Sequence, residues 1–142
     1  MLLDANVLLY AVDASSPHHQ RSHGWLRSAL TGTSRVGIPW QTVGAFLRIA
    51  THPRVFERPL TTAQAWSVLD GWLASPVVWI PPATDRTGAV LRGLMLEAGV
   101  AGVRTTDAQL AAMAIEFGVP VVSADADFAR FPGVSWINPL AN

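Results

Sequence analysis

Two residue types are absent from this chain, and each absence excludes several kinds of chemistry. There is no cysteine among the 142 residues, which excludes disulfide bonds, thiolate metal sites and cysteine nucleophiles. There is no lysine either, because all ten basic residues are arginines. Haloacid-dehalogenase-like phosphotransfer enzymes, receiver domains and P-loop enzymes need a lysine beside their acidic or phosphate-binding residues. These α/β classes are therefore disfavoured.

Charged residues and long apolar runs are also scarce. Only 14% of the residues are charged and the net charge is zero, so no overall field draws the protein toward nucleic acid. No apolar run is long enough to span a bilayer and no charged-then-apolar leader is present, so we expect no membrane association and a cytoplasmic location. Because half of the residues are apolar, we expect one compact domain over residues 1–142.

Short apolar segments alternate with helical patterns along the chain. Strands are expected at residues 2–3, 35–38, 77–80, 119–123 and 135–137. Helices are expected at residues 6–11, 18–30, 40–51, 62–74, 84–98 and 107–117, with a short turn of helix at 125–130. This alternation predicts an α/β fold with a central parallel sheet of about five short strands flanked by helices.

Four of the ten acidic residues lie in three separate stretches at the ends of these elements. Asp4 closes the first strand, and Asp125 and Asp127 follow the fourth. Asp107 begins a helix after Thr106, which we expect to cap that helix. Ligands of parallel sheets bind at the carboxyl ends of the strands. We therefore expect the aspartates of the three stretches to share one site.

Clustered carboxylates of this kind suit a hard divalent cation. Neighbouring carboxylates repel each other, and their oxygen atoms are good ligands for Mg²⁺ or Mn²⁺. Such a cation can activate water and stabilise charge on a phosphodiester. Asn6 is a candidate to hydrogen-bond a ligand or that water. Taken singly, Asp107 also suits an ordinary first-turn position and Asp125 and Asp127 suit a turn, whereas Asp4 is harder to explain because aspartate is depleted in strands.

Three motifs together resemble a PIN domain and, more narrowly, a VapC-type toxin of a bacterial toxin–antitoxin pair. They are LDANVLLYA at residues 3–11, TDAQLAA at 106–112 and SADADF at 123–128. Four further stretches are similar to one branch of those toxins: PW at 39–40, FLR at 46–48, PRVF at 53–56 and FARFPG at 128–133. The resemblance covers nearly the whole chain.

The resemblance implies a Mg²⁺- or Mn²⁺-dependent endoribonuclease with a five-stranded parallel sheet. It also implies an RNA substrate of the tRNA or rRNA class, a cognate VapB-type antitoxin that silences the enzyme, and a homodimer. Carried over residue by residue, the catalytic and metal-binding acids are Asp4, Asp107 and Asp125. The expected supporting residues are Asn6, Thr106, Ser123 and Asp127. Arg104, three residues before Asp107, is expected to contact RNA phosphates.

One departure from the family pattern leaves alternatives open. Many PIN domains carry a glutamate on the third helix, where this chain has Ala45. Glu116 cannot easily replace it, because it lies about half a turn round the helix from Asp107. A site with three carboxylates would hold a metal more weakly. One alternative is therefore a catalytically weak RNA- or antitoxin-binding module. A DNA-directed nuclease of the same fold is a separate alternative.

Overall fold

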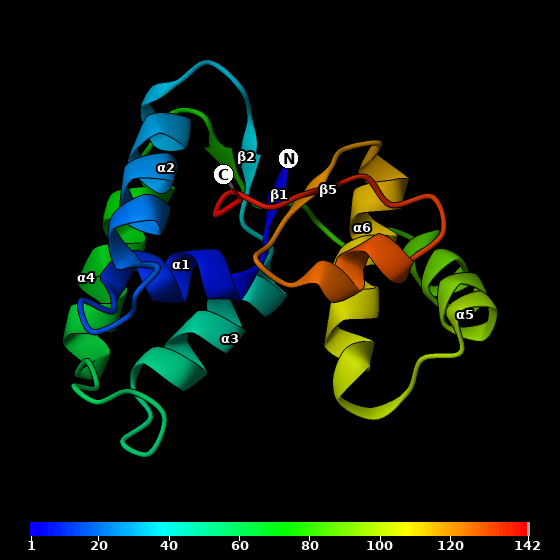
Figure 1. The fold of residues 1–142 in the computed structure, drawn as a ribbon. Helices are drawn as coiled ribbons and strands as arrows, with labels where there is room; N and C mark the ends of the chain where they lie inside the picture. Colours follow the sequence, from blue (N-terminus) through cyan, green and yellow to red (C-terminus); the bar gives the residue numbers. More distant parts are fainter. Residues whose placement is uncertain (142) are drawn as a thin grey trace.

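Five short parallel strands form the centre of the structure, a computed structural model that describes residues 1–141 (Figure 1). The strands are β1 Leu2–Leu3, β2 Val36–Gly37, β3 Val78–Trp79, β4 Val121–Val122 and β5 Trp136–Ile137. Their order in the sheet is β3-β2-β1-β4-β5, and every neighbouring pair is parallel. The predicted α/β fold and five-stranded sheet are confirmed, although four strands are shorter than the apolar runs that predicted them.

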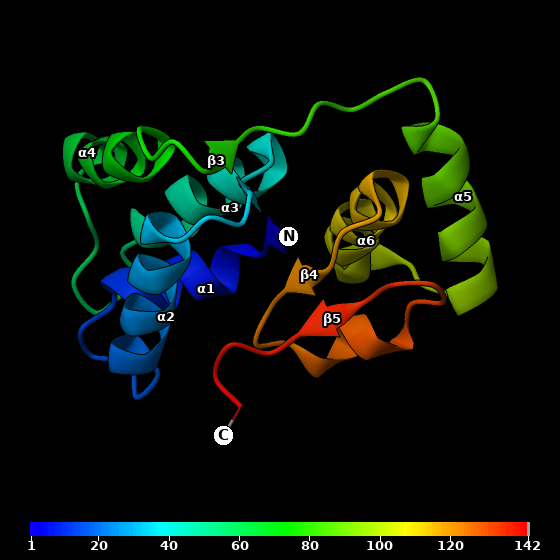
Figure 2. The ribbon, with the colours of Figure 1, turned by 90° about the horizontal axis from the view of Figure 1, so that it is seen from above.

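Helices cover both faces of this sheet. The α-helices are α1 Ala5–Val12, α2 His19–Thr31, α3 Trp40–Ala50, α4 Thr62–Leu73, α5 Thr87–Ala98 and α6 Thr105–Phe117. Two short 3-10 helices are η1 Gly102–Arg104 and η2 Ala126–Arg130. The helices α1 to α4 lie on one side of the strands, and α5 and α6 lie on the other (Figure 2). Within residues 1–141, no helix is both long and apolar enough to cross a bilayer.

Capping residues set the ends of several helices where the sequence predicts them. Thr61 accepts a hydrogen bond from the Gln64 N–H at 3.2 Å, and the Gln64 side chain accepts one from the Thr61 N–H at 2.9 Å. Gly99 and Gly118 end α5 and α6 in the left-handed conformation, with φ of 62° and 63°. Helix α5 begins three residues later than predicted, at Thr87, whose hydroxyl accepts from the N–H of residue 84.

The two faces of the sheet bury separate apolar clusters. Leu3 and Val122 pack with α1 to α4, whereas Leu2 and Val121 pack with α5 and α6, because successive side chains of a strand point to opposite faces. Leu2 pairs with Val121 and Leu3 with Val122 in the β1–β4 register. The residues that follow these two strands therefore emerge side by side at one edge of the sheet.

The close approach of β2 to β1 leaves no room for a side chain at Gly37, so we expect Gly37→Ala to destabilise the protein. An added Cβ would meet Leu2 Cδ2, which is fully buried, and would lie 3.2 Å from Trp79 Nε1. Overpacking of this kind typically costs about 1–3 kcal/mol. Urea unfolding would measure the loss, with Gly71→Ala as the control because a Cβ there meets nothing within 4 Å. An unchanged stability of Gly37→Ala would contradict this packing.

Candidate functional site

Asp4 directly follows β1, and two hydrogen bonds fix its carboxylate. Oδ1 accepts from the Ala5 N–H at 2.7 Å, and Oδ2 accepts from the Ser123 hydroxyl at 2.7 Å. Burial raises the pKa of the Asp4 carboxyl above its ordinary value; the hydrogen bond from Ser123 opposes this rise, and the nearby Asp125 adds to it. Asp4 therefore caps α1 and faces the end of β4 at the same time.

The Ser123 hydroxyl joins the first and last acidic motifs. It is fully buried, donates to Asp4, and accepts from Asn6 Nδ2 at 2.9 Å and from the Asp125 N–H at 3.0 Å. Asn6 Oδ1 in turn accepts from the Ala124 N–H at 3.2 Å. The structure thus brings Asn6 and Ser123 into the predicted site, where they hold the loop after β4 against the start of α1.

Asp107 lies in the first turn of α6 and faces the same place. Among residues 1–141, no group donates a hydrogen bond or an ion pair to its carboxylate. Burial raises the pKa of this carboxyl to about 6, and the charges of Asp4, Asp125 and Asp127 add to the rise, while Arg104 opposes it. Residues from three distant stretches therefore act on one another electrostatically, so the predicted convergence of the acidic motifs is present in the fold.

The predicted capping role of Thr106 is wrong. Helix α6 begins at Thr105, two residues before the predicted start at Asp107, and the 3-10 helix η1 leads directly into it. Residue 106 is already helical, so its hydroxyl donates back to the Val103 carbonyl at 3.0 Å instead of accepting from the helix N–H groups. Thr106 nevertheless lines the site together with Asp107.

Asp125 and Asp127 make different contacts in the loop after β4. Asp125 caps η2, because its Oδ1 accepts from the Asp127 N–H at 2.8 Å. Asp127 pairs with Arg104 at 3.1 Å and with Arg130 at 3.5 Å. Arg104 therefore lies in the site as the sequence predicts, but an aspartate of the same site already engages its guanidinium group.

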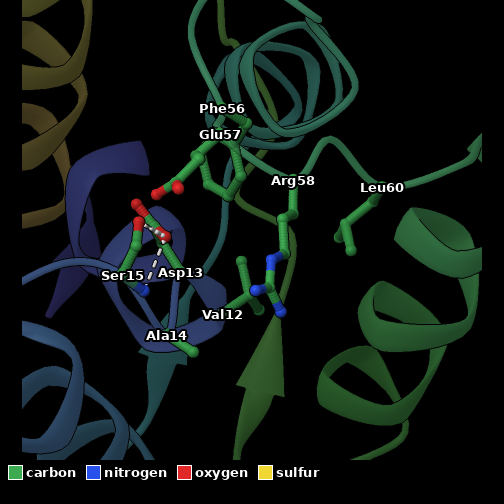
Figure 3. Close-up of a pocket in the computed structure, with 8 residues that line it drawn as sticks. All are labelled: Val12, Asp13, Ala14, Ser15, Phe56, Glu57, Arg58 and Leu60. Atoms are coloured by element: carbon green, nitrogen blue, oxygen red, sulfur yellow. Dashed lines mark hydrogen bonds between the residues drawn. The ribbon is translucent and has the colours of Figure 1, made fainter.

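Asp107 stands between two cavities. The smaller, about 90 Å³, is lined by Asp4, Ala45 and Arg48 as well, and the larger, about 340 Å³, is lined by Arg104 and Asp127. Another cavity of about 320 Å³ lies between the end of α1 and the loop after α3 (Figure 3). It is lined by residues 12–15, 56–58 and 60 and touches none of the three acidic motifs, so it is not the candidate site.

The donor atoms of the site fit a hard divalent cation. Every candidate ligand is a carboxylate oxygen. A cation would offset both the burial that chiefly raises the pKa values of Asp4 and Asp107 and the repulsion from neighbouring acids that adds to the rise. Within the described chain, no three acidic, histidine or cysteine side chains already stand close enough together to hold one ion. Hydrogen bonds orient the carboxylates of Asp4 and Asp125, and arginines pair with that of Asp127.

Ala45 lies on α3 and lines the smaller cavity together with Asp4 and Asp107. A longer side chain at this position can therefore extend into that cavity. Glu116 lies elsewhere, hydrogen-bonded to the hydroxyls of Thr84 and Thr87. The prediction that Glu116 cannot replace the missing glutamate is therefore confirmed.

The sequence did not predict a role in the site for two residues of α3 that line the smaller cavity. Thr42 is 3% exposed and donates to the Leu3 carbonyl at 2.8 Å, which fixes α3 against the end of β1 beside Asp4. Gln41 lines the same cavity, and within residues 1–141 its Nε2 is the one buried side-chain polar atom without a partner. A threonine or a glutamine in an amphipathic helix carries no distinctive sequence signal, so only the fold could identify them.

We expect Asp107→Asn to stabilise the metal-free protein at neutral pH. The pKa of Asp107 has its ordinary value of 3.8 in the unfolded chain and a value of about 6 in the folded one. At pH values between these two, the folded state therefore binds more protons than the unfolded state. Stability therefore falls as the pH rises from about 4 to about 6. The substitution should recover about 1–2 kcal/mol at pH 7, less than the full shift because water reaches the side chain. Urea unfolding of both proteins at these pH values is the measurement, and identical pH dependence would contradict the prediction.

The sequence is similar over nearly its whole length to known proteins of one family. The family described as PIN domain matches residues 1–134. The chain is similar to Ribonuclease VapC37 of Mycobacterium tuberculosis (strain ATCC 25618 / H37Rv), with 42% identity over 99% of this chain and 97% of that protein. It is also similar to Ribonuclease VapC33 of M. tuberculosis (strain CDC 1551 / Oshkosh), with 42% identity over 96% of each.

Solved structures share the fold at low sequence identity. VapBC2 from Rickettsia felis, bound to a DNA fragment from their promoter, has a TM-score of 0.72 at 18% identity, over 96% of each chain. The Sarcin-Ricin loop cleaving toxin VapC20 of M. tuberculosis has a TM-score of 0.66 at 15% identity, over 94% of this chain and 98% of that chain. These likenesses show that the arrangement of strands and helices recurs in other proteins.

Proposed function

Since the chain belongs to the PIN domain family and, within it, to the VapC ribonucleases, we propose that it is an endoribonuclease that hydrolyses RNA as the toxin of a toxin–antitoxin pair. One observation carries this proposal at the level of chemistry. Three distant motifs meet in the fold: Asp4 and Asp107 line one cavity, and the Ser123 hydroxyl bonds both the Asp4 carboxylate and the Asp125 N–H. Proteins hold such mutually repelling acids together chiefly where a cation is to be bound.

The residues of the chain have separate tasks in this proposal. Asp4, Asp107 and Asp125 hold Mg²⁺ or Mn²⁺, which supplies the Lewis acidity that activates water and stabilises charge on the phosphodiester. Ser123 fixes the orientation of Asp4 through its hydroxyl. Asp107, which has no hydrogen-bond partner of its own, is free to turn toward a ligand.

The remaining residues of the last motif and of η1 act around these acids. Asp127 supports the site through its ion pairs, and it keeps Arg104 beside Asp107. From there Arg104 can contact an RNA phosphate once the substrate competes for its guanidinium group. Thr106 holds the backbone before Asp107 through its bond to residue 103.

The partners of the protein follow from the same proposal. VapBC complexes are among the structures that share this fold, so we propose a VapB-type antitoxin as the silencing partner. We also propose structured RNA of the tRNA or rRNA class as the substrate, a homodimer as the assembled form and the cytoplasm as the location. All four rest on membership of the VapC ribonucleases.

Cleavage assays with the purified chain, free of antitoxin, test the proposal. We expect RNA to be cut in Mn²⁺ or Mg²⁺ and to stay intact in excess EDTA, because the site offers no pair of histidines for metal-free cleavage. A matched DNA panel should stay intact. Undiminished cleavage in EDTA would overturn the metal requirement, and cleavage of DNA alone would show a DNA-directed nuclease.

A further inference from the structure

Three residues of α3 form an exposed row along the helix. Trp40, Gly44 and Arg48 follow each other at intervals of four, so they lie one above another on one face, and Trp40 and Arg48 are about 12 Å apart along the axis. The opposite face of α3 is buried in the core through Val43 and Phe46. Trp40 is 60% exposed, which is unusual for the largest apolar side chain and leaves its ring open to a partner.

This row borders the smaller cavity of the site. Arg48 lines the smaller cavity together with Asp4 and Asp107, and Gln41, the neighbour of Trp40, lines it as well. A single-stranded nucleic acid lying along this row would therefore pass the rim of the cavity lined by Asp4 and Asp107. The row is continuous with the site instead of forming a separate surface.

Arg48 differs from the other arginines that line the two cavities of the site. Arg104 and Arg130 both pair with Asp127, whereas within residues 1–141 Arg48 has no hydrogen bond or ion pair. A guanidinium group without an acidic partner can bind a phosphate without first giving up an ion pair. On the α3 side of the site, the phosphates of a nucleic acid would therefore meet a positive charge that no acidic side chain neutralises.

We propose that this row, Trp40, Gly44 and Arg48, binds unpaired RNA nucleotides next to the scissile bond. Trp40 stacks on a base, Arg48 contacts a backbone phosphate, and the missing side chain at Gly44 leaves space for the sugar–phosphate chain between them. The inference rests on the proposed ribonuclease function and narrows its substrate to RNA whose bases are unstacked, as in loops and bulges. A duplex would not offer a free base face to Trp40.

Fluorescence anisotropy with a short fluorescein-labelled single-stranded oligoribonucleotide of mixed sequence, in EDTA, tests the two contacts. We expect Trp40→Ala to weaken binding on the order of tenfold, Trp40→Phe to retain most of it, and a duplex of the same sequence to bind weakly. Arg48→Gln should reduce the slope of log K against log salt by about 0.7. Trp66→Ala and Arg54→Gln are matched controls because those residues are exposed but line neither cavity of the site.

Gly44 allows a sharper test, because a Cβ added there meets nothing within 4 Å. We expect Gly44→Ala to bind RNA like the wild type, and Gly44→Glu to bind weakly because its carboxylate repels the backbone. Both variants should keep the Mn²⁺ affinity of the wild type and melt no lower than it, because Ala and Glu both favour a helix more than Gly does. This separates lost RNA contact from lost structure.

The outcomes distinguish this inference from the proposed function. If the wild type cleaves RNA in Mn²⁺ but Trp40→Ala, Arg48→Gln and Gly44→Glu bind and cleave RNA as well as the wild type does, the row is no substrate surface and the inference fails alone. If light scattering shows that Trp40→Ala and Gly44→Glu turn a dimer into a monomer with RNA binding intact, the row is an interface between copies and the inference is overturned. Absence of cleavage by the wild type would refute the proposed function itself.

Discussion

Asp4→Asn is expected to reduce RNA cleavage by roughly 10²–10³-fold or more while leaving the fold intact. The substitution removes a carboxylate that repels its neighbours and that the proposed mechanism uses to hold the cation. The Asn side chain is nearly the same size, and its oxygen can still accept from the Ala5 N–H. Steady-state cleavage in Mn²⁺ gives the activity, and circular dichroism gives the fold.

The stability of Asp4→Asn reports on two opposing effects. Removing a buried charge with a raised pKa is favourable, but the amide cannot accept from Ser123 with the strength of a carboxylate. We therefore expect only a small change in melting temperature without metal. Asp70→Asn on α4 is the control, because this residue is exposed and lines neither cavity of the site. Full activity of Asp4→Asn would remove Asp4 from the proposed ligands.

Ala45→Glu is expected to tighten Mn²⁺ binding about tenfold or more. Position 45 lines the same cavity of about 90 Å³ as Asp4 and Asp107, so the new carboxylate can add an oxygen ligand. The same charge increases repulsion when no metal is bound, so the stability of the metal-free protein should fall at neutral pH. Isothermal titration calorimetry with Mn²⁺ measures the affinity, and urea unfolding in EDTA measures the cost.

Gly44→Glu is the matched control for this gain. It adds the same side chain to the same helix, one residue earlier, at an exposed position that does not line the cavity. We expect its Mn²⁺ affinity to equal that of the wild type. If Ala45→Glu and Gly44→Glu change the affinity equally, the gain comes from net charge and not from a ligand at position 45.

The sequence predicted the architecture because its signals are local. Apolar runs that end at an acid or a proline predict buried strands, and glycines 99 and 118 predict helix ends. The true strand lengths depend on where neighbouring strands stop pairing, which no single run of residues contains. The predicted cap at Thr106 was wrong for a similar reason, since the 3-10 turn before the helix moves the start of α6 by two residues, from Asp107 to Thr105.

The site was predictable only in part. The three acidic motifs could be recognised by their positions at element ends, and the fold brings them together. The ion pairs of Asp127 with Arg104 and Arg130 could not be foreseen, because they depend on how η1 and η2 face each other in space. The contact of Thr42 with the Leu3 carbonyl is likewise a product of tertiary packing between residues 39 positions apart.

The bond between Ser123 and Asp4 also bears on the synthesis of the protein. It joins residues 119 positions apart, and β1 pairs with β4 only after nearly the whole chain has left the ribosome. Contacts of such sequence separation form late because the intervening chain must first be ordered. While the chain is being synthesised, Asp4 has therefore not yet met Asp107, Asp125 or the Ser123 hydroxyl that orients its carboxylate. The ribosome making this toxin is exposed to the assembled site only once the C-terminal strands are free to join the sheet.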